Sequence, residues 1–178
     1  MARVFTAFDI EDEKILEELR DIRDRFDLGF KPVPCEKMHL TFEFFKDVDE
    51  DGIEKLKRCL DDVEVGSFHS RLKGVGAFPS QEHTRVVWAG VENGKFHNLY
   101  RRVSSHGVES DNGYDFVPHV TLLRVEDVSG ERKRKLRRML REFEDHDFGG
   151  IKVDKLKLFR SDLKPEGSEY SELYVKNL

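Results

Sequence analysis

The sequence has few cysteines and no long hydrophobic run. Cys35 and Cys59 are its only cysteines, too few for a disulfide framework and not in the C-x-x-C spacing of many metal and redox sites. No stretch approaches the roughly 18 consecutive apolar residues of a transmembrane helix. The N-terminus turns acidic after a short alternating apolar run, which is unlike a secretory signal. We therefore expect a cytoplasmic protein that makes no membrane contact.

Several common functional signatures are also missing. No glycine-rich loop of the G-x-x-x-x-G-K-[ST] type is present, which argues against nucleotide-driven ligation. The histidines show no zinc-ligand spacing with cysteine or with one another, so we expect no metal and no other cofactor. The formal net charge of −5 gives no overall attraction for nucleic acid. Any contact with RNA would therefore need a local basic site.

The chain nevertheless has enough apolar material for a core. Hydrophobic residues make up 38% of its 178 residues and include 14 Phe, and this length is typical of one domain. Charged residues make up another 38%, which implies a densely charged surface of mixed sign. We expect residues 1–178 to form a single domain and the protein to be a monomer.

The hydrophobic pattern alternates between the period of a strand and that of a helix. Strands are predicted at 3–10, 38–45, 68–78, 84–91 and 119–125, with a closing hairpin of 151–161 and 168–177; amphipathic helices are predicted at 15–26, 53–63, 96–103 and 136–143. The elements fall into two similar halves. This order predicts an α+β fold with two pseudo-symmetric lobes, each an antiparallel sheet with helices on the outside, that form a central cleft.

A His-x-Thr motif followed by a bulky apolar residue occurs once in each half. Residues 39–42 read His-Leu-Thr-Phe, and residues 119–122 read His-Val-Thr-Leu. Because residues two apart in a strand share a face, each histidine points the same way as its threonine. One such motif is common in strands and carries little weight. Two copies at equivalent places in matching halves favour a functional pair.

Related by a two-fold axis, the two motifs would place two imidazoles and two hydroxyls around one bound group. In-line displacement at a cyclic phosphate needs a base on the attacking water and an acid on the departing oxygen. With a pKa near 6.5, one histidine can be neutral and the other protonated at neutral pH. The hydroxyls of Thr41 and Thr121 can donate to the non-bridging phosphate oxygens.

The motifs resemble those of the two-histidine (2H) phosphoesterase superfamily, and within it the RNA 2′,3′-cyclic phosphodiesterases, historically called 2′-5′ RNA ligases. Nearly the whole chain takes part in the resemblance. The similar segments are RVFTAFDI, HLTFEFF, FPSQEHTRVVWAGV, FVPHVTLLRV and SDLKPEGSEYSELYVKNL. Phe42 stands where the family usually has leucine, which should only enlarge a core contact.

The resemblance implies hydrolysis of a 2′,3′-cyclic phosphate end of RNA, such as a tRNA fragment, to a 2′-phosphomonoester. It implies that His39 is the proton donor to the departing 3′ oxygen and that His119 is the proton acceptor from water, with Thr41 and Thr121 holding the phosphate. It also implies that the same groups can join such an end to a 5′-hydroxyl. Because the two motifs are near copies, the sequence by itself does not separate acid from base.

Two residues five positions after the histidines are further candidates. Arg124 matches the arginine of the family's second motif, and a guanidinium suits a phosphate. Phe44 could stack on a base, although a phenylalanine in a strand is more often part of the core. An odd offset places both residues on the face opposite the histidines in a regular strand. Arg124 therefore reaches the site only if the strand bulges, twists or ends first.

Other residues fit ordinary structural roles better. Trp88 lies in an apolar run and is expected in the core, and His83 precedes a strand and could line the cleft. Seven basic residues between 132 and 141 could follow an RNA backbone, but a solvated helix face explains them more simply. The acidic stretches 9–18 and 47–54 are expected to face away from an anionic substrate. The four remaining histidines are His69, His97, His106 and His146. His97 and His106 fall on a helix pattern and are expected to face solvent.

Two alternatives remain open at this point. A sibling enzyme with the same catalytic groups could act on an ADP-ribose cyclic phosphate or trim an RNA 3′ end, because such siblings differ mainly in their loops. A nucleotide- or RNA-binding module without turnover is the other alternative. It is disfavoured because binding alone does not need two acid–base groups.

Overall fold

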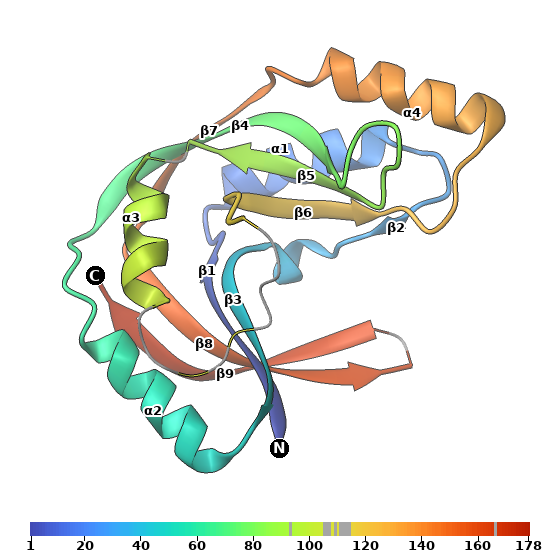
Figure 1. The fold of residues 1–178 in the computed structure, drawn as a ribbon. Helices are drawn as coiled ribbons and strands as arrows, with labels where there is room; N and C mark the ends of the chain where they lie inside the picture. The colour runs from blue at the N-terminus through green and yellow to red at the C-terminus, as the bar shows by residue number, and fades with distance from the viewer. Residues whose placement is uncertain (93, 105–107, 109, 111–114, 166) are drawn as a thin grey trace.

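The computed structural model describes residues 1–92, 94–104, 108, 110, 115–165 and 167–178. Its strands are β1 (Ala2–Asp9), β2 (Lys31–Pro32), β3 (His39–Val48), β4 (Phe68–Phe78), β5 (Val86–Val91), β6 (His119–Arg124), β7 (Asp147–Val153), β8 (Lys155–Lys164) and β9 (Gly167–Asn177). Its helices are α1 (Glu13–Arg25), α2 (Glu50–Asp61), α3 (Gly94–Val103), α4 (Gly130–Glu142) and the short 3-10 helix η1 (Cys35–Lys37). The protein is therefore of the α+β class (Figure 1).

The described strands belong to one antiparallel sheet with the order β7-β4-β5-β6-β3-β1-β8-β9, and β2 pairs with β6. Two groups of four strands meet where β3 lies beside β6. These two central strands share a single paired position, Leu40 opposite Val120. The pairing is thus extensive within each group and confined to one residue pair at the join.

Helix starts follow from local chemistry. The carboxylate of Asp12 accepts hydrogen bonds from the backbone N–H of Lys14 (2.9 Å) and Ile15 (3.2 Å), which caps α1. Asp49 caps α2 in the same way through Gly52 N–H at 2.8 Å. Each helix then buries one apolar stripe at helical spacing. The buried residues of the stripes are Ile15, Leu19 and Ile22; Ile53, Leu56 and Leu60; Phe96, Leu99 and Val103; and Leu136, Met139 and Leu140.

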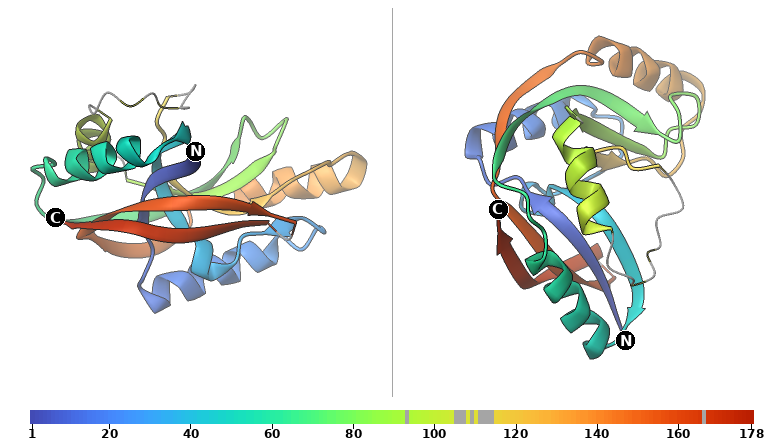
Figure 2. Two further views of the ribbon diagram at one scale, coloured as in Figure 1. Left: turned by 90° about the horizontal axis from the view of Figure 1, so that it is seen from below. Right: turned by 60° about the vertical axis from the view of Figure 1, so that its left-hand side comes forward.

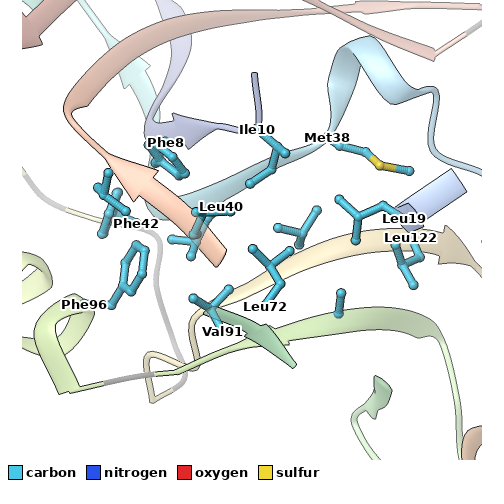
Figure 3. Close-up of a cluster of buried hydrophobic side chains, with 14 of the residues drawn as sticks. Phe8, Ile10, Leu19, Met38, Leu40, Phe42, Leu72, Val91, Phe96 and Leu122 are labelled. Atoms are coloured by element: carbon cyan, nitrogen blue, oxygen red, sulfur yellow. The ribbon is translucent and has the colours of Figure 1, made fainter. Parts of the chain in front are cut away.

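The helices cover the sheet in two places. Helix α1 contacts β6 and β7 and α4 contacts β4, whereas α2 contacts β3, β8 and β9. The two views of Figure 2 show α4 and α2 at well-separated ends of the molecule. Side chains of helices and strands share one large buried cluster, part of which is drawn in Figure 3 around Leu40, Phe42, Phe96 and Leu122. A smaller buried cluster of Phe5, Ala7 and Phe159 is separate from it.

The predicted elements are confirmed in kind and order, with two differences. The segment predicted as one strand, 151–161, is divided at Asp154: β7 pairs with β4, and β8 pairs with β1 and β9. Neither β2 nor η1 was predicted, because each is only two or three residues long. Within the described residues, no helix is long and apolar enough to cross a membrane.

Phe42 packs between α3 and the segment that precedes β6. Its side chain is 1% exposed, and its ring stacks on Phe96 (centroids 6.2 Å apart) and Phe116 (5.8 Å). We expect Phe42→Leu to lower the free energy of unfolding by about 1–2 kcal/mol, because it removes buried carbon and two ring contacts. Urea unfolding with an unchanged m-value would measure this loss. A variant as stable as the parent would show that the ring contributes no net packing energy.

Candidate active site

Both His-x-Thr motifs begin a central strand, and the join of the sheet brings them together. His39 and Thr41 flank Leu40, and His119 and Thr121 flank Val120, on the face away from the buried Leu40 and Val120 side chains. In an antiparallel pair, diagonal neighbours on one face lie about 7–8 Å apart. We call the side of the sheet that carries these four side chains the histidine face. The four predicted side chains therefore form one group rather than two sites.

The two motifs have equivalent neighbours. His39 is opposite Asp9 and Thr41 is opposite Ala7 on β1; His119 is opposite Gly90 and Thr121 is opposite Trp88 on β5. The register thus matches position by position. The neighbours differ in chemistry at both positions: Trp88 stands opposite Thr121 where Ala7 is opposite Thr41, and Asp9 provides a carboxylate beside His39 where Gly90 has no side chain beside His119.

Each motif is followed by a β-bulge at the same position. On β3 the register shifts between Thr41 and Glu43, and on β6 it shifts between Thr121 and Leu123. Burial follows the same sequence in both strands: two consecutive buried residues come after the threonine, and an exposed residue comes next. The extra residue reverses the alternation of the strand. Residues five positions after each histidine therefore return to the histidine face.

The bulges place Phe44 and Arg124 at equivalent positions. Phe44 is 37% exposed, with its ring centroid 5.2 Å from that of Phe5, so it is not the buried core residue that is more usual in a strand. Arg124 is exposed, and its charge acts on His39. The geometric objection to Arg124 is thereby removed.

Each imidazole is held through its Nδ1 atom. His39 Nδ1 lies 2.8 Å from the carbonyl oxygen of Lys37, and His119 Nδ1 lies 2.7 Å from that of Val117. A carbonyl oxygen only accepts, so Nδ1 must carry the hydrogen in both rings. Nε2 is therefore the atom that gains and loses a proton in each histidine.

Aromatic rings surround both imidazoles. His39 lies against Phe5 (centroids 5.0 Å apart) and edge-on to Tyr170 (5.4 Å). His119 lies edge-on to Phe78 (4.9 Å) and at 6.2 Å from Trp88. Such packing fixes the ring planes and removes water from around them. Phe5, Phe78 and Tyr170 were not predicted as site residues, although all three belong to segments that resemble the family.

Burial lowers the pKa of both histidines, because it disfavours the charged imidazolium. The hydrogen bonds to the carbonyl oxygens of Lys37 and Val117 oppose this effect. The Asp9 carboxylate also raises the pKa of His39, whereas the charges of His119 and Arg124 lower it. The charges of His119 and Arg124 therefore lie near enough to His39 to act on it.

Asp9 is itself held in place by Lys157. The Lys157 Nζ atom lies 3.0 Å from Asp9 Oδ2, 3.0 Å from Glu11 Oε1 and 3.2 Å from Glu172 Oε2. Burial would lower the pKa of Lys157, but these carboxylates raise it well above its usual value. The expectation that the acidic stretch from residue 9 faces away from the site is therefore wrong for Asp9, which lies directly opposite His39.

The remaining candidates lie as follows. Trp88 was expected in the core but is only half-buried, and its ring contacts Phe78 on the histidine face. His69, His83 and His97 are exposed, and His146 pairs with Glu18 at 2.8 Å. His106 lies outside the described residues. Among the described residues, no group of three or more His, Cys, Asp and Glu could hold a metal ion.

Comparisons with known proteins converge on one family. The family model described as "LigT like Phosphoesterase" matches residues 10–88 and 95–170. The RNA 2′,3′-cyclic phosphodiesterase of Methanocaldococcus jannaschii is 34% identical over 94% of this chain and 96% of its own, and that of Methanothermobacter thermautotrophicus is 34% identical over 99% and 98%. A crystal structure of a Thermus thermophilus protein has a TM-score of 0.79 at 27% identity, covering 99% of this chain and 97% of its own. E. coli LigT complexed with phosphate has a TM-score of 0.77 at 22% identity, covering 99% and 97%.

We expect NMR to find the same tautomer in both histidines. At a pH where the rings are neutral, long-range ¹H–¹⁵N correlations should show Nδ1 protonated and Nε2 bare in His39 and His119. Both should titrate below the usual value near 6.5, because burial lowers both pKa values. The exposed His69 is the internal control. A protonated Nε2 in either neutral ring would contradict the arrangement.

Proposed function

Because this chain belongs to the LigT-like phosphoesterase family, we propose that it hydrolyses 2′,3′-cyclic phosphate ends of RNA to 2′-phosphomonoesters. The observation that carries the proposal is the placement of two histidines and two threonines around the single paired position of β3 and β6. In both histidines Nδ1 is hydrogen-bonded to a backbone carbonyl, which leaves Nε2 to exchange protons. The curated relatives that share nearly the full length are named for this activity.

The reaction uses one histidine on each side of phosphorus. Nε2 of His119 accepts a proton from water as the water oxygen bonds to phosphorus. The bond from phosphorus to the 3′ oxygen breaks, and the proton on Nε2 of His39 passes to that oxygen. The hydroxyls of Thr41 and Thr121 donate to the non-bridging oxygens, where negative charge accumulates. A 5′-hydroxyl in place of water would give a 2′-5′ linkage by the same steps.

The assignment of acid and base rests on the difference between Asp9 and Gly90. A carboxylate opposite His39 stabilises the imidazolium form, which a proton donor needs before the reaction. The position opposite His119 has only a glycine, and burial favours the neutral form that a proton acceptor needs. The two motifs are nearly identical, so this neighbour is the feature that separates their roles.

Arg124 and Phe44 would complete the site from equivalent positions on the two strands. The guanidinium of Arg124 would bind the phosphate, and the exposed ring of Phe44 would stack on the terminal base. The matching registers and bulges also support two pseudo-symmetric lobes, β7-β4-β5-β6 and β3-β1-β8-β9, whose histidine faces form the walls of a central cleft. Residues 1–178 would then form one catalytic domain.

The direct test is incubation with RNA that ends in a 2′,3′-cyclic phosphate, in the presence of EDTA. We expect a 2′-phosphate product from the parent protein. We expect His39→Ala and His119→Ala each to lower kcat by at least about 100-fold, the usual contribution of a general acid or base. Tight binding without turnover by the parent would overturn the proposal, and a 3′-phosphate product would require the opposite geometry.

Two controls accompany this test. His69→Ala removes an exposed histidine of β4 and should leave kcat unchanged. Circular dichroism and a thermal melt should show that both active-site variants are folded. Near-parental kcat in either variant would refute the two-histidine mechanism.

The assignment of His39 as acid makes a separate prediction for Asp9→Asn. Losing the carboxylate lowers the pKa of His39, so less of it is protonated above that pKa. On the alkaline side of the pH profile we expect kcat/KM to fall by up to about tenfold, which corresponds to a pKa of His39 lower by one unit. On the acid side, where protonation of the base limits the rate, kcat/KM should stay unchanged. Glu11→Gln removes another Lys157 partner without emptying the position opposite His39 and is the matched control. A gain confined to the acid side would instead make His39 the base, because a base with a lower pKa stays deprotonated to a lower pH.

A further inference from the structure

Helix α4 concentrates positive charge in an otherwise acidic protein. Its thirteen residues include seven basic and two acidic ones, a net of +5, while the whole chain carries −5. The remainder of the chain therefore carries −10. Charge separated to this degree produces a strongly positive field at one place on the surface.

Two of these cations are used within the fold. Arg132 donates to the carbonyl oxygen of Leu28 and lies over the ring of Phe30 at 5.4 Å. Arg137 pairs with Glu82 at 3.3 Å. These contacts attach α4 to the loops at its side, and they leave the other basic residues of the helix available.

The outward basic row consists of Arg134, Arg138 and Arg141. All three are exposed, and none has an ion-pair partner among the residues that the structure describes. Their spacing of four and three residues puts them along one side of the helix over about 10 Å. Like charges at this spacing repel one another and weaken a helix. Some cations elsewhere have carboxylate partners, for example Arg71 with Asp147 (2.5 Å) and Lys155 with Glu11 (2.7 Å).

One loop connects this row to the histidine site. Phe78 contacts the ring of His119, residues 79–85 follow it, and Glu82 within that loop pairs with Arg137 of α4. Figure 1 shows α4 beside the loop between β4 and β5, on the far side of that loop from the β8–β9 hairpin. An extended chain that leaves the site past Phe78 would therefore meet α4.

We propose that the outward basic row on α4 binds the sugar–phosphate backbone of the substrate RNA several nucleotides away from its cyclic end. The inference rests on the proposed function and adds to it a substrate class: RNA long enough to reach α4, in preference to a dinucleotide. Guanidinium groups suit phosphates, and contacts to the backbone carry no sequence preference. A narrow strand can touch the helix alone, whereas a broad anionic membrane would also meet the acidic remainder of the protein.

The test compares two substrates in one variant. We expect Arg134→Gln/Arg138→Gln/Arg141→Gln to lower kcat/KM about tenfold for a cyclic-phosphate RNA of about 20 nucleotides at about 50 mM salt. The dinucleotide with the same end should be hydrolysed at the parental rate. A plot of log(kcat/KM) against log salt should become less steep by about 2 for the long RNA, at about 0.7 for each lost phosphate contact.

Lys55→Gln/Lys57→Gln/Arg58→Gln is the matched control. It removes three cations from α2, which contacts the other half of the sheet. It should leave kcat/KM unchanged for both substrates. The proposal would be overturned if the α4 variant lost kcat/KM equally for both substrates, or lost none for the long RNA. Equal kcat/KM of the parent for the two substrates at low salt would also overturn it.

Binding separates this proposal from the catalytic one. If the parent hydrolyses neither substrate, the proposed function fails, and the row is tested by fluorescence anisotropy with a 20-nucleotide RNA. If the α4 variant loses binding to this RNA and the α2 variant keeps it, the result supports the row as an RNA-backbone site. Equal binding by both variants, or parental binding to vesicles of anionic lipid but not to RNA, would overturn it.

Discussion

The pairing of Leu40 with Val120 is the constraint on which the site depends. Both side chains are fully buried, and they fix the central strands against each other at one point only. In an antiparallel pair, this single contact determines which residues flank it on the opposite face. His39, Thr41, His119 and Thr121 consequently share that face. The buried residues of the two motifs therefore set the geometry of the polar ones, and a one-residue slip would turn every polar side chain into the core.

The bulges extend the same reasoning along each strand. A regular strand would bury Arg124 and Phe44 among helices, at a high cost for the guanidinium. One extra residue per strand returns both to the histidine face without disturbing the motif. The bulges thus add an aromatic ring on β3 and a guanidinium on β6 to the histidine face. The motifs match while these two groups differ, so the two strands present similar histidine–threonine pairs but different side chains beyond them.

The sequence was sufficient for the parts that follow from periodicity and from the repeated motif. Strand and helix order, the helix stripes and the shared face of each His-Thr pair needed only the spacing of apolar residues. The bulges were harder to predict from the sequence. On β6 the consecutive apolar residues Leu122 and Leu123 interrupt the alternation, but on β3 the equivalent residues are Phe42 and Glu43, which look like a regular apolar–polar alternation. Trp88 was misplaced because its run is apolar. Its indole instead lies on the histidine face, where a Cβ at Gly76 on β4 would collide with it.

The position of Asp9 could not be predicted from its neighbours in the chain. It lies in an acidic stretch, and only the register with β3 places it opposite His39. In the proposed mechanism Asp9 would act beside a bound phosphate, and a carboxylate without a counter-charge would repel that phosphate. Lys157 provides that compensation while Glu11 and Glu172 share its charge. Asp9 can therefore favour the protonated form of His39 at short range without making the site anionic, and the bound phosphate itself would then raise the pKa of both histidines toward neutrality.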